Sequence, residues 1–350
     1  MPPVVINVDG ITRAAKQYDP LLKTLPFETL DPVLTDLGIN LLEVGDGENI
    51  ETTFERKGGI IQPYSATTVD QDADESEIGR FVEMGLQTKK VRAAIKDHID
   101  NYTSEVVVVN NVNKVDDQTK KHPLEALILE KNVITIAEDQ IDAMFHSKYD
   151  AADKSPMGVS DGFFTLQDNF VVSGDIAAAK KNYAECGSLA APDPDDEEDF
   201  TAYKNILAWL RQADPSLRKG NVILYLPSAV KLAVIDAAAN KFRRLNDVNS
   251  NVLQGLLREH AEIPNLLIKS SSCLGTGTRI FLTRSGNLDY GMNMRGNAQY
   301  VQVRTPYKDP NWVQFWAQFR VGQRIKNLHR KNFMMSEGTT VSLSLSGDYS

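Results

Sequence analysis

Ser160 lies at the centre of Gly158-Val159-Ser160-Asp161-Gly162, whose spacing matches the nucleophile elbow of serine-dependent hydrolases. Such an elbow holds the serine on a strained turn between a buried strand and a helix, where its hydroxyl can attack an acyl carbon. The seven residues before this motif, AADKSPM, are mostly polar or small and are interrupted by a proline, so they do not predict a buried strand. We interpret the motif as a coincidence of spacing and keep a hydrolase using Ser160 as an alternative class.

Three further patterns resemble phosphate or metal sites, and each is incomplete. Gly275 and Gly277 lack the third glycine of a dinucleotide loop, and the strand-like residues 279–284 follow where a helix N-terminus is required. We interpret them as a hairpin turn between strands at 265–270 and 279–284. The acidic run at 193–199 lacks the central glycine and final glutamate of a calcium loop. Since the five histidines and two cysteines show no metal-ligand spacing, we predict no catalytic, cofactor-binding or metal-binding residue.

The charge pattern of the last third of the chain is more informative than these motifs. The whole chain has a formal net charge of −9, yet the stretch 279–331 holds ten cations and only two acids, Asp289 and Asp309. A basic sheet in an acidic protein predicts a surface that meets the acidic surface of other copies, and therefore assembly. The ten cations are Arg279, Arg284, Arg295, Arg304, Lys308, Arg320, Arg324, Lys326, Arg330 and Lys331.

Composition excludes several classes of protein. A chain of 350 residues suits two domains or one elaborated fold, and 42% apolar with 24% charged residues is near the globular norm. The negative net charge disfavours a dedicated nucleic-acid binder, although a local basic face could contact phosphate. No stretch is apolar enough for a membrane span and no secretory signal is present, so we expect a cytoplasmic protein. We expect Cys186 and Cys273, which lie far apart, to be free thiols.

The first third of the chain predicts an arm and a projecting β-loop. Residues 2–45 contain five prolines, which forbid a long helix and favour an extended arm with one or two short helices. Residues 49–62 give two β-prone runs around a glycine pair that suits a tight hairpin turn. An acidic stretch with little to bury follows, so we interpret 49–88 as a long projecting β-loop. Residues 88–102 predict either a helix or a strand followed by a short helix.

The rest of the chain predicts a long helix, an α/β centre and a β-rich end. Apolar residues recur at near-helical spacing over 123–149, which would span about 40 Å. A helix at 200–213 and a helix capped by Ser228 flank the wholly apolar strand 221–227. Residues 243–262 predict a polar loop, and the alternating pattern after them predicts β-strands.

Four aromatic residues lie close together in the sequence WVQFWAQFRVGQRI near the C-terminus. Glutamines separate them, which is typical of a strand with two unlike faces. We interpret these aromatics as core or interface packing and not as a base-stacking platform; they are Trp312, Phe315, Trp316 and Phe319.

The order of these elements resembles the major capsid proteins of tailed bacteriophages, which have the Hong Kong 97-like fold. Four segments are similar to parts of that fold: SDGFFTLQDN after the long helix, GNVILYLPSAVKLAVIDAA in the axial domain, IPNLLIKSSSCLGTGTRIFLTRSGNLDYGMN for the strands that leave it, and VQVRTPYKDPNWVQFWAQFRVGQRIKNLHRKNF for the closing peripheral strands. The resemblance covers about residues 45–340 and is one of pattern and order, without a single diagnostic motif.

This resemblance implies an α+β fold with a defined domain layout. The expected parts are an N-terminal arm (1–45), an extended β-loop (46–88), a peripheral domain with a spine helix (89–199, helix about 123–149), an axial domain (200–294), and peripheral return strands with the C-terminus (295–350).

The resemblance also implies a structural role without enzymatic activity. The chain would assemble as hexamers and pentamers into an icosahedral shell around double-stranded DNA, in the host cytoplasm, and remain in the virion. Its partners would be other copies of itself, scaffolding, portal and decoration proteins, and packaged DNA on the inner face, with no cofactor and no membrane. An encapsulin-like protein compartment has the same fold and is the alternative.

We expect assembly contacts at the β-loop and at the basic strands. Some relatives cross-link a β-loop lysine to an asparagine of a neighbour, and Lys57 lies in that region, but we expect it to be a surface lysine without such a bond. The predicted contact residues are Arg56, Lys57, Asp70, Asp72, Asp74, Glu75, Arg295, Arg304, Arg320 and Arg324.

Overall fold

The protein has a mixed α/β fold, seen in a computed structural model that describes residues 29–44, 49–56, 79–98, 123–193, 198–242, 249–292, 301–304 and 312–337. Its strands form three sheets, of five, four and two strands. Of the helices that the structure describes, none has the length and apolar composition needed to cross a bilayer. The predictions for Gly58–Gly59 and for the acidic run at 70–77 lie outside the described residues.

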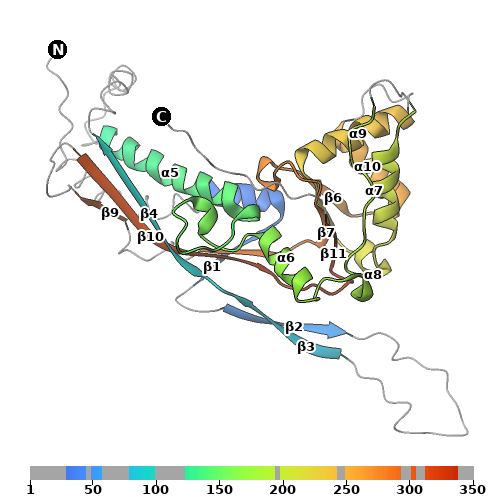
Figure 1. The fold of residues 1–350 in the computed structure, drawn as a ribbon, viewed down its shortest axis with the longest axis horizontal. Helices are drawn as coiled ribbons and strands as arrows, with labels where there is room; N and C mark the ends of the chain where they lie inside the picture. Colours follow the sequence, from blue (N-terminus) through green and yellow to red (C-terminus); the bar gives the residue numbers. More distant parts are fainter. Residues whose placement is uncertain are drawn as a thin grey trace, which may run out of the picture.

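The five-stranded sheet is organised around one long strand, β10 (Trp312–Ile325) (Figure 1). Its first part pairs antiparallel with β4 (Lys89–His98) on one side and β9 (Val301–Arg304) on the other. Its last part pairs with β8 (Leu288–Met292), which in turn pairs parallel with β1 (Asn40–Glu43). Phe315 and Phe319 are buried on one face of β10, which confirms the prediction of a two-faced strand.

The four-stranded sheet has the order β11 (Phe333–Ser336), β7 (Ile280–Arg284), β5 (Val222–Tyr225), β6 (Leu266–Lys269). Because β6 and β7 lie on opposite sides of β5, the residues between them form a crossover. The prediction of a hairpin turn at Gly275 and Gly277 was therefore wrong. The sequence signal was misleading because two adjacent strand-like segments do not reveal a third strand inserted between them.

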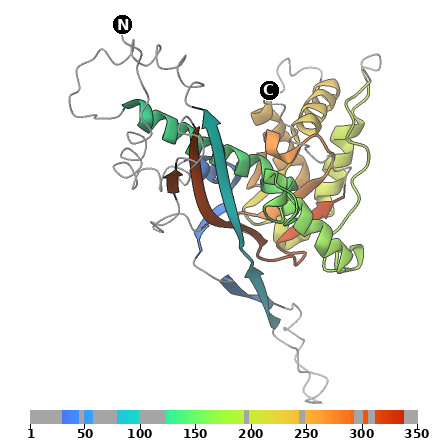
Figure 2. The same ribbon diagram turned by 60° about the vertical axis from the view of Figure 1, so that its left-hand side comes forward.

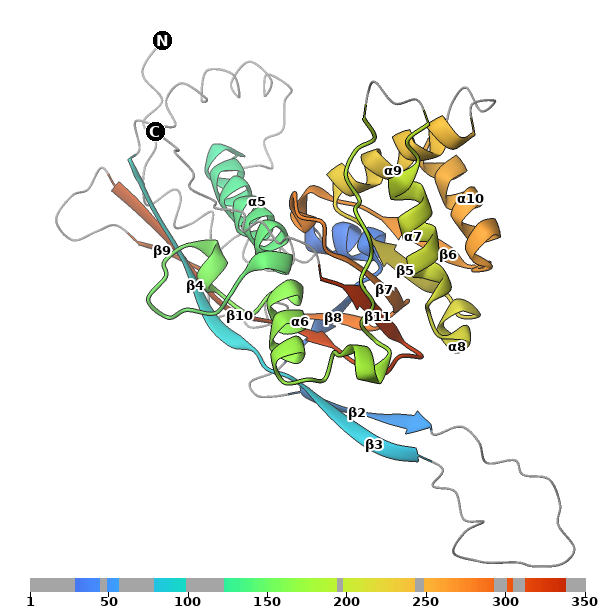
Figure 3. The same cartoon turned by 45° about the vertical axis from the view of Figure 1, so that its right-hand side comes forward.

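Alternate side chains of the four-stranded sheet belong to two separate hydrophobic cores. Ile223 and Tyr225 of β5 face a core that includes the five-stranded sheet, whereas Val222 and Leu224 face a core made with other helices. This period-two alternation lets one sheet be buried on both faces, as an entirely apolar strand requires. The four-stranded sheet thus joins the two halves of the molecule (Figure 3).

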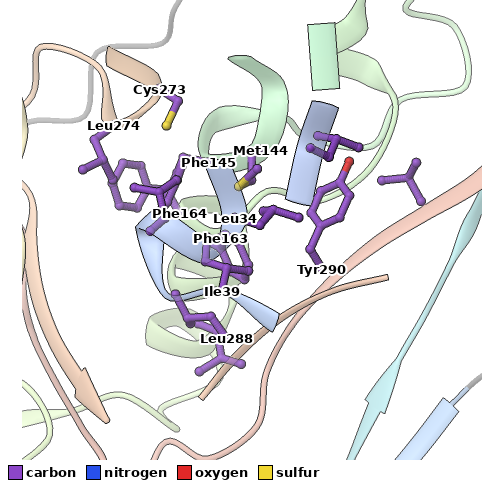
Figure 4. Packing of buried hydrophobic residues seen from close by; sticks show 14 of the residues in the cluster. Leu34, Ile39, Met144, Phe145, Phe163, Phe164, Cys273, Leu274, Leu288 and Tyr290 are labelled. Atoms are coloured by element: carbon purple, nitrogen blue, oxygen red, sulfur yellow. The ribbon is translucent and has the colours of Figure 1, made fainter. Parts of the chain in front are cut away.

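The first core is covered by α5 (Pro123–His146), α6 (Phe163–Val172) and a helix at 29–37. Figure 4 shows side chains from all three of these helical regions meeting over the sheet, among them Leu34 and Phe163. The α5 helix ends three residues before the predicted limit of 149.

The prediction of an arm with one or two short helices over 2–45 is confirmed for a helix at 29–37, but this helix is buried and does not lie apart from its own domain. Leu30 and Leu34 are fully buried, and the Tyr225 hydroxyl donates a hydrogen bond of 2.6 Å to the Leu37 carbonyl. The helix at 29–37 is therefore part of the subunit core, because its leucines recur with helical spacing and fill that core.

The second core is covered by α7 (Thr201–Arg211), α9 (Ser228–Lys241) and α10 (Ser250–Ala261). The α9 helix begins after Pro227 and has no side-chain cap, so the prediction of a Ser228 cap was wrong. The α10 helix corrects the prediction of a polar loop at 243–262. The shorter helical turns are α8 (Pro215–Arg218), Pro156–Gly158, Ala178–Lys180 and Ser272–Leu274.

The two-stranded sheet projects from the molecule in all three ribbon views (Figures 1, 2 and 3). It pairs β2 (Asn49–Arg56) antiparallel with β3 (Gly79–Leu86), and we call this pair the β-arm. The prediction of a projecting β-loop at 49–88 is confirmed for these two strands. The described partner of β2 is β3, not the residues just after Gly58–Gly59.

Candidate assembly surface

The β-arm is attached to the five-stranded sheet by a cluster of charged residues on the face opposite α5. Arg324 of β10 and Asp289 of β8 lie opposite each other in the strand register, and both are buried, with 3% and 0% exposure. The Arg324 Nε donates a hydrogen bond of 3.0 Å to the Asp289 carboxylate. A buried pair of this kind is tolerated only when its remaining donors and acceptors are also satisfied.

The remaining partners come from the β-arm and from neighbouring strands. Arg324 donates to the Met84 carbonyl at 3.1 Å and to the Glu51 carboxylate at 2.7 Å, so it bonds both strands of the arm. Lys326 Nζ lies 3.1 Å from Asp289, which also accepts 3.0 Å from the Asn40 amide. We call Arg324, Asp289, Glu51 and Lys326 the root cluster. It holds the base of the β-arm in one place on the sheet.

Two glycines give the base of the β-arm room to lie close to the sheet. Gly291 of β8 and Gly322 of β10 are opposite each other in the register, two residues along their strands from Asp289 and Arg324. A Cβ on Gly291 would lie 2.6 Å from the Leu86 side chain, and a Cβ on Gly322 would overlap the Gln87 carbonyl. The chain between β3 and β4 therefore crosses the sheet at a distance that only glycine permits.

Two large apolar side chains of the β-arm that the structure describes are exposed. Ile50, next to Glu51 at the base, is 56% exposed, and Phe81, further out, is 73% exposed, which is unusual for such large apolar side chains. A two-stranded ladder alone is at best marginally stable in water. The arm therefore has the composition of a surface that another molecule covers.

The structure describes only two of the predicted contact side chains, Arg320 and Arg324. Arg324 is buried in the root cluster, where it bonds its own subunit, and we no longer propose it as an assembly contact. Arg320 is partly exposed on the same face of β10. Arg56 and Arg304 end strands β2 and β9, but their side chains are not described. Outside the described residues lie Lys57, Asp70, Asp72, Asp74, Glu75 and Arg295.

The ten cations of the last third do not form one basic surface, which corrects that expectation. Arg279 is 3% exposed and forms a salt bridge with Asp168 and a hydrogen bond of 3.0 Å to the Phe164 carbonyl. The Arg284 guanidinium donates to the Ser216 carbonyl at 2.9 Å, on the other sheet. These arginines form bonds between elements of the same subunit, and the sequence alone did not distinguish them from exposed surface cations.

Sequence reasoning missed three cations on β4. Lys90, Arg92 and Lys96 are exposed, and the register places them on the same face as Arg320 of β10. We call these four residues the basic face. The alternation of cations with Val91, Ala93 and Ile95 indicates a strand with one charged face. Because a helix was also predicted as an alternative for 88–102, this charged face was not identified.

The candidate catalytic and metal groups find no support among the described residues. Ser160 is buried at 3% exposure and follows a short 3₁₀ turn, not the strand that a nucleophile elbow requires. Nowhere in the described ranges do three or more His, Cys, Asp or Glu side chains form a group able to hold a metal ion. Both cysteines are free, as predicted, and burial raises the pKa of Cys186 to about 12.

His146, at the end of α5, is the described histidine whose pKa is lowered. Its ring packs edge-on against Phe164 with centroids 5.0 Å apart, and its Nε2 is buried without a partner beside Gly275. Burial is the main cause of the lowered pKa, and the positive charge of Arg279 adds to it. His146 therefore packs the end of α5 against α6 and against the crossover that precedes β7.

Comparisons with known proteins agree on the fold alone. No family model matches the sequence, and none of the curated proteins matches it either. Among solved structures, a chain of the satellite phage P4 procapsid with its size determination (Sid) protein matches with a TM-score of 0.50 at 12% identity, covering 89% of this chain and 90% of that one. The capsid of a native GTA particle matches with a TM-score of 0.50 at 14% identity, covering 87% and 94%.

A third match is a virus-like particle from Pyrococcus furiosus, with a TM-score of 0.44 at 10% identity, covering 90% of this chain and 97% of that one. That TM-score is too low to distinguish a phage capsid from a protein compartment. The two matches at 0.50 each span most of both chains, so this chain has the fold of phage capsid subunits, as its sequence pattern predicted.

Proposed function

We propose that this chain is the major capsid protein of a tailed bacteriophage and forms an icosahedral shell around double-stranded DNA. The observation that carries the proposal is the β-arm: it is firmly attached at the root cluster and presents two exposed large apolar side chains, Ile50 at its base and Phe81 further out. A neighbouring subunit that covers this arm explains both features. The capsid fold of the whole chain supports the same conclusion.

In this proposal the Hong Kong 97-like layout applies to the chain. The five-stranded sheet with α5 is the peripheral domain, and the four-stranded sheet with α7, α9 and α10 is the axial domain, which packs around the fivefold and sixfold axes. The N-terminal arm, scaffolding, portal and decoration partners, and assembly in the host cytoplasm belong to the same proposal. The protein acts by assembly and not by turnover.

Expression of the chain alone and with a candidate scaffolding protein tests this function. We expect fast-sedimenting particles that appear as closed shells by negative-stain microscopy. A chain that stays monomeric at high concentration, with and without the scaffold, would contradict the proposal. Shells filled with one protein and free of DNA in infected or native cells would assign the chain to an encapsulin-like compartment instead. Loss of an ester-hydrolysis activity in Ser160→Ala would revive the enzyme alternative.

A further inference from the structure

The two ends of the four-stranded sheet, β11 and β6, are closed in different ways. At β11 a short segment of backbone pairs with the strand: the Met335 amide donates to the Asn182 carbonyl, and the Ala184 amide donates to the Met335 carbonyl, each at 3.0 Å. Among the strands that the structure describes, none pairs with the outer side of β6. An open edge of this kind can pair with a strand of a second chain, so its backbone groups need another partner.

The outward backbone groups of β6 belong to Leu266 and Ile268. On the inner side of the strand, the carbonyls of Asn265 and Lys269 accept hydrogen bonds of 3.2 and 3.0 Å from amides on the β5 side of the sheet. Backbone groups of a strand alternate in direction from one residue to the next. The amides and carbonyls of Leu266 and Ile268 therefore point away from β5, along the outer edge.

Two side chains of α10, which lies beside β6, take the place of a neighbouring strand (Figure 3). The Arg258 Nε donates a hydrogen bond of 2.8 Å to the Leu266 carbonyl, and the Gln254 Oε1 accepts one of 3.4 Å from the Ile268 amide. Residues four apart on a helix are separated by about 6 Å along its axis, close to the roughly 6.6 Å between strand residues two apart. We call Gln254 and Arg258 the edge cap.

The composition of β6 favours pairing with another strand. Its sequence is LLIK, and Leu267 is 42% exposed. A free lysine on an edge strand usually repels a second strand. Here Lys269, the one charged residue of β6, forms a salt bridge of 2.8 Å with Asp36. The strand is therefore apolar and carries no free charge to protect its edge.

Two copies of β6 are complementary to each other about a twofold axis at Leu267. If the strands run antiparallel with the two copies of Leu267 opposite each other, Leu266 of one copy lies opposite Ile268 of the other. Such a pair exchanges both of its backbone hydrogen bonds, so the Ile268 amide donates to the Leu266 carbonyl across the axis. These are the same amide and the same carbonyl that the edge cap occupies.

We propose that the edge cap is an autoinhibitory contact that keeps β6 from pairing with the β6 of a second copy. The partner is a second copy because the two groups held by the cap complement each other across the twofold pair. Under the proposed shell function such pairing would compete with ordered assembly. The inference about the cap does not rest on that function.

Removal of the edge cap tests this inference. Gln254→Met/Arg258→Met keeps long side chains of good helix propensity and removes both hydrogen bonds. We expect the monomer–dimer dissociation constant of unassembled subunits, measured by analytical ultracentrifugation, to fall about tenfold or more, because paired edges regain several backbone hydrogen bonds. Arg211→Met is the matched control: this exposed arginine of α7 donates 2.8 Å to the His260 carbonyl of a helix, and its loss should leave the dissociation constant unchanged.

Leu267→Cys reports the register of the pairing. In a pair centred on this residue the two Cα atoms lie about 4.5 Å apart, within reach of a disulfide. After mild oxidation we expect a disulfide-linked dimer when Leu267→Cys is added to the edge-cap variant, and much less when the cap is intact. Leu232→Cys, at an exposed leucine of α9, should give little dimer in either case. Native Cys186 and Cys273 interfere little, because burial raises the pKa of both thiols.

The outcomes decide the role of the cap separately from the proposed function. An edge-cap variant that is folded by circular dichroism, stays monomeric and gives no Leu267→Cys dimer would overturn the inference. An equal yield of that dimer with the cap intact would also overturn it, as would equal cross-linking of Leu232→Cys, which indicates general aggregation. If the double variant does not fold, Gln254→Met alone frees the Ile268 amide and is judged by the same two measurements. Wild-type chains that form no shell would contradict the proposed function alone.

Discussion

Arg324→Met tests whether the root cluster holds the β-arm to the sheet. The substitution leaves Asp289, which is fully buried, with only Lys326 Nζ at 3.1 Å and the Asn40 amide at 3.0 Å. Removing one partner of a buried ion pair costs about 3–5 kcal/mol. Because two partners of Asp289 remain, we expect the lower end of that range, about 3 kcal/mol.

Glu51→Gln provides the matched comparison. Glu51 bonds the same guanidinium, but its side chain is 45% exposed, so its loss should cost at most about 1 kcal/mol. The double variant Asp289→Leu/Arg324→Met should recover part of the loss, since it leaves no unpaired buried charge.

The free energy of unfolding of unassembled subunits, measured by urea denaturation with tryptophan fluorescence, checks these values. Equal effects of Arg324→Met and Glu51→Gln, or a loss below about 1 kcal/mol for Arg324→Met, would refute the reasoning that burial decides the cost.

Three other changes have expected outcomes. Gly322→Ala should destabilise the subunit by about 1–3 kcal/mol in the same urea assay, because the added Cβ meets the backbone of Gln87. Gly291→Ala should destabilise it by less, because there the added Cβ meets the side-chain ends of Leu86 and Val44. A larger loss for Gly291→Ala than for Gly322→Ala would contradict the close crossing of the chain over the sheet. The pKa of His146 is lowered in the folded state, so unfolded chains bind more protons below pH 6.5, and stability should fall as the pH drops from about 7.5 to 5.5. His146→Leu should flatten that slope, measured by thermal unfolding, and an unchanged slope would assign it to other groups. The pKa of Cys186 is raised to about 12, so iodoacetamide at pH 8 should alkylate it far more slowly in the folded chain than in urea, as mass spectrometry would show.

Local sequence patterns were enough to locate several elements of the fold. The alternation of WVQFWAQFRVGQRI predicted the strand that became β10, and the apolar run at 221–227 predicted β5, buried on both faces. Pro123 correctly marked the start of α5, because a proline is tolerated in the first helical turn.

The failures come from information that a local pattern does not contain. The α10 helix was missed although Asn249 caps it and Leu253 and Leu257 recur with helical spacing, because its polar residues outweighed them. The insertion of β5 between β6 and β7 depends on long-range pairing. For the same reason local pattern could not separate Arg324, whose acidic partners are 35 and 273 residues away, from a partly exposed cation such as Arg320.

We propose that neighbouring subunits complete the β-arm. Hydrogen exchange, followed by mass spectrometry on the unassembled chain and on assembled particles, measures this directly. We expect peptides covering 49–56 and 79–86 to exchange about tenfold or more slowly in particles than in subunits, whereas a peptide covering 315–321 of the core is protected in both. Equal protection of the β-arm in the two states would show that the subunit completes it alone, and would contradict the account.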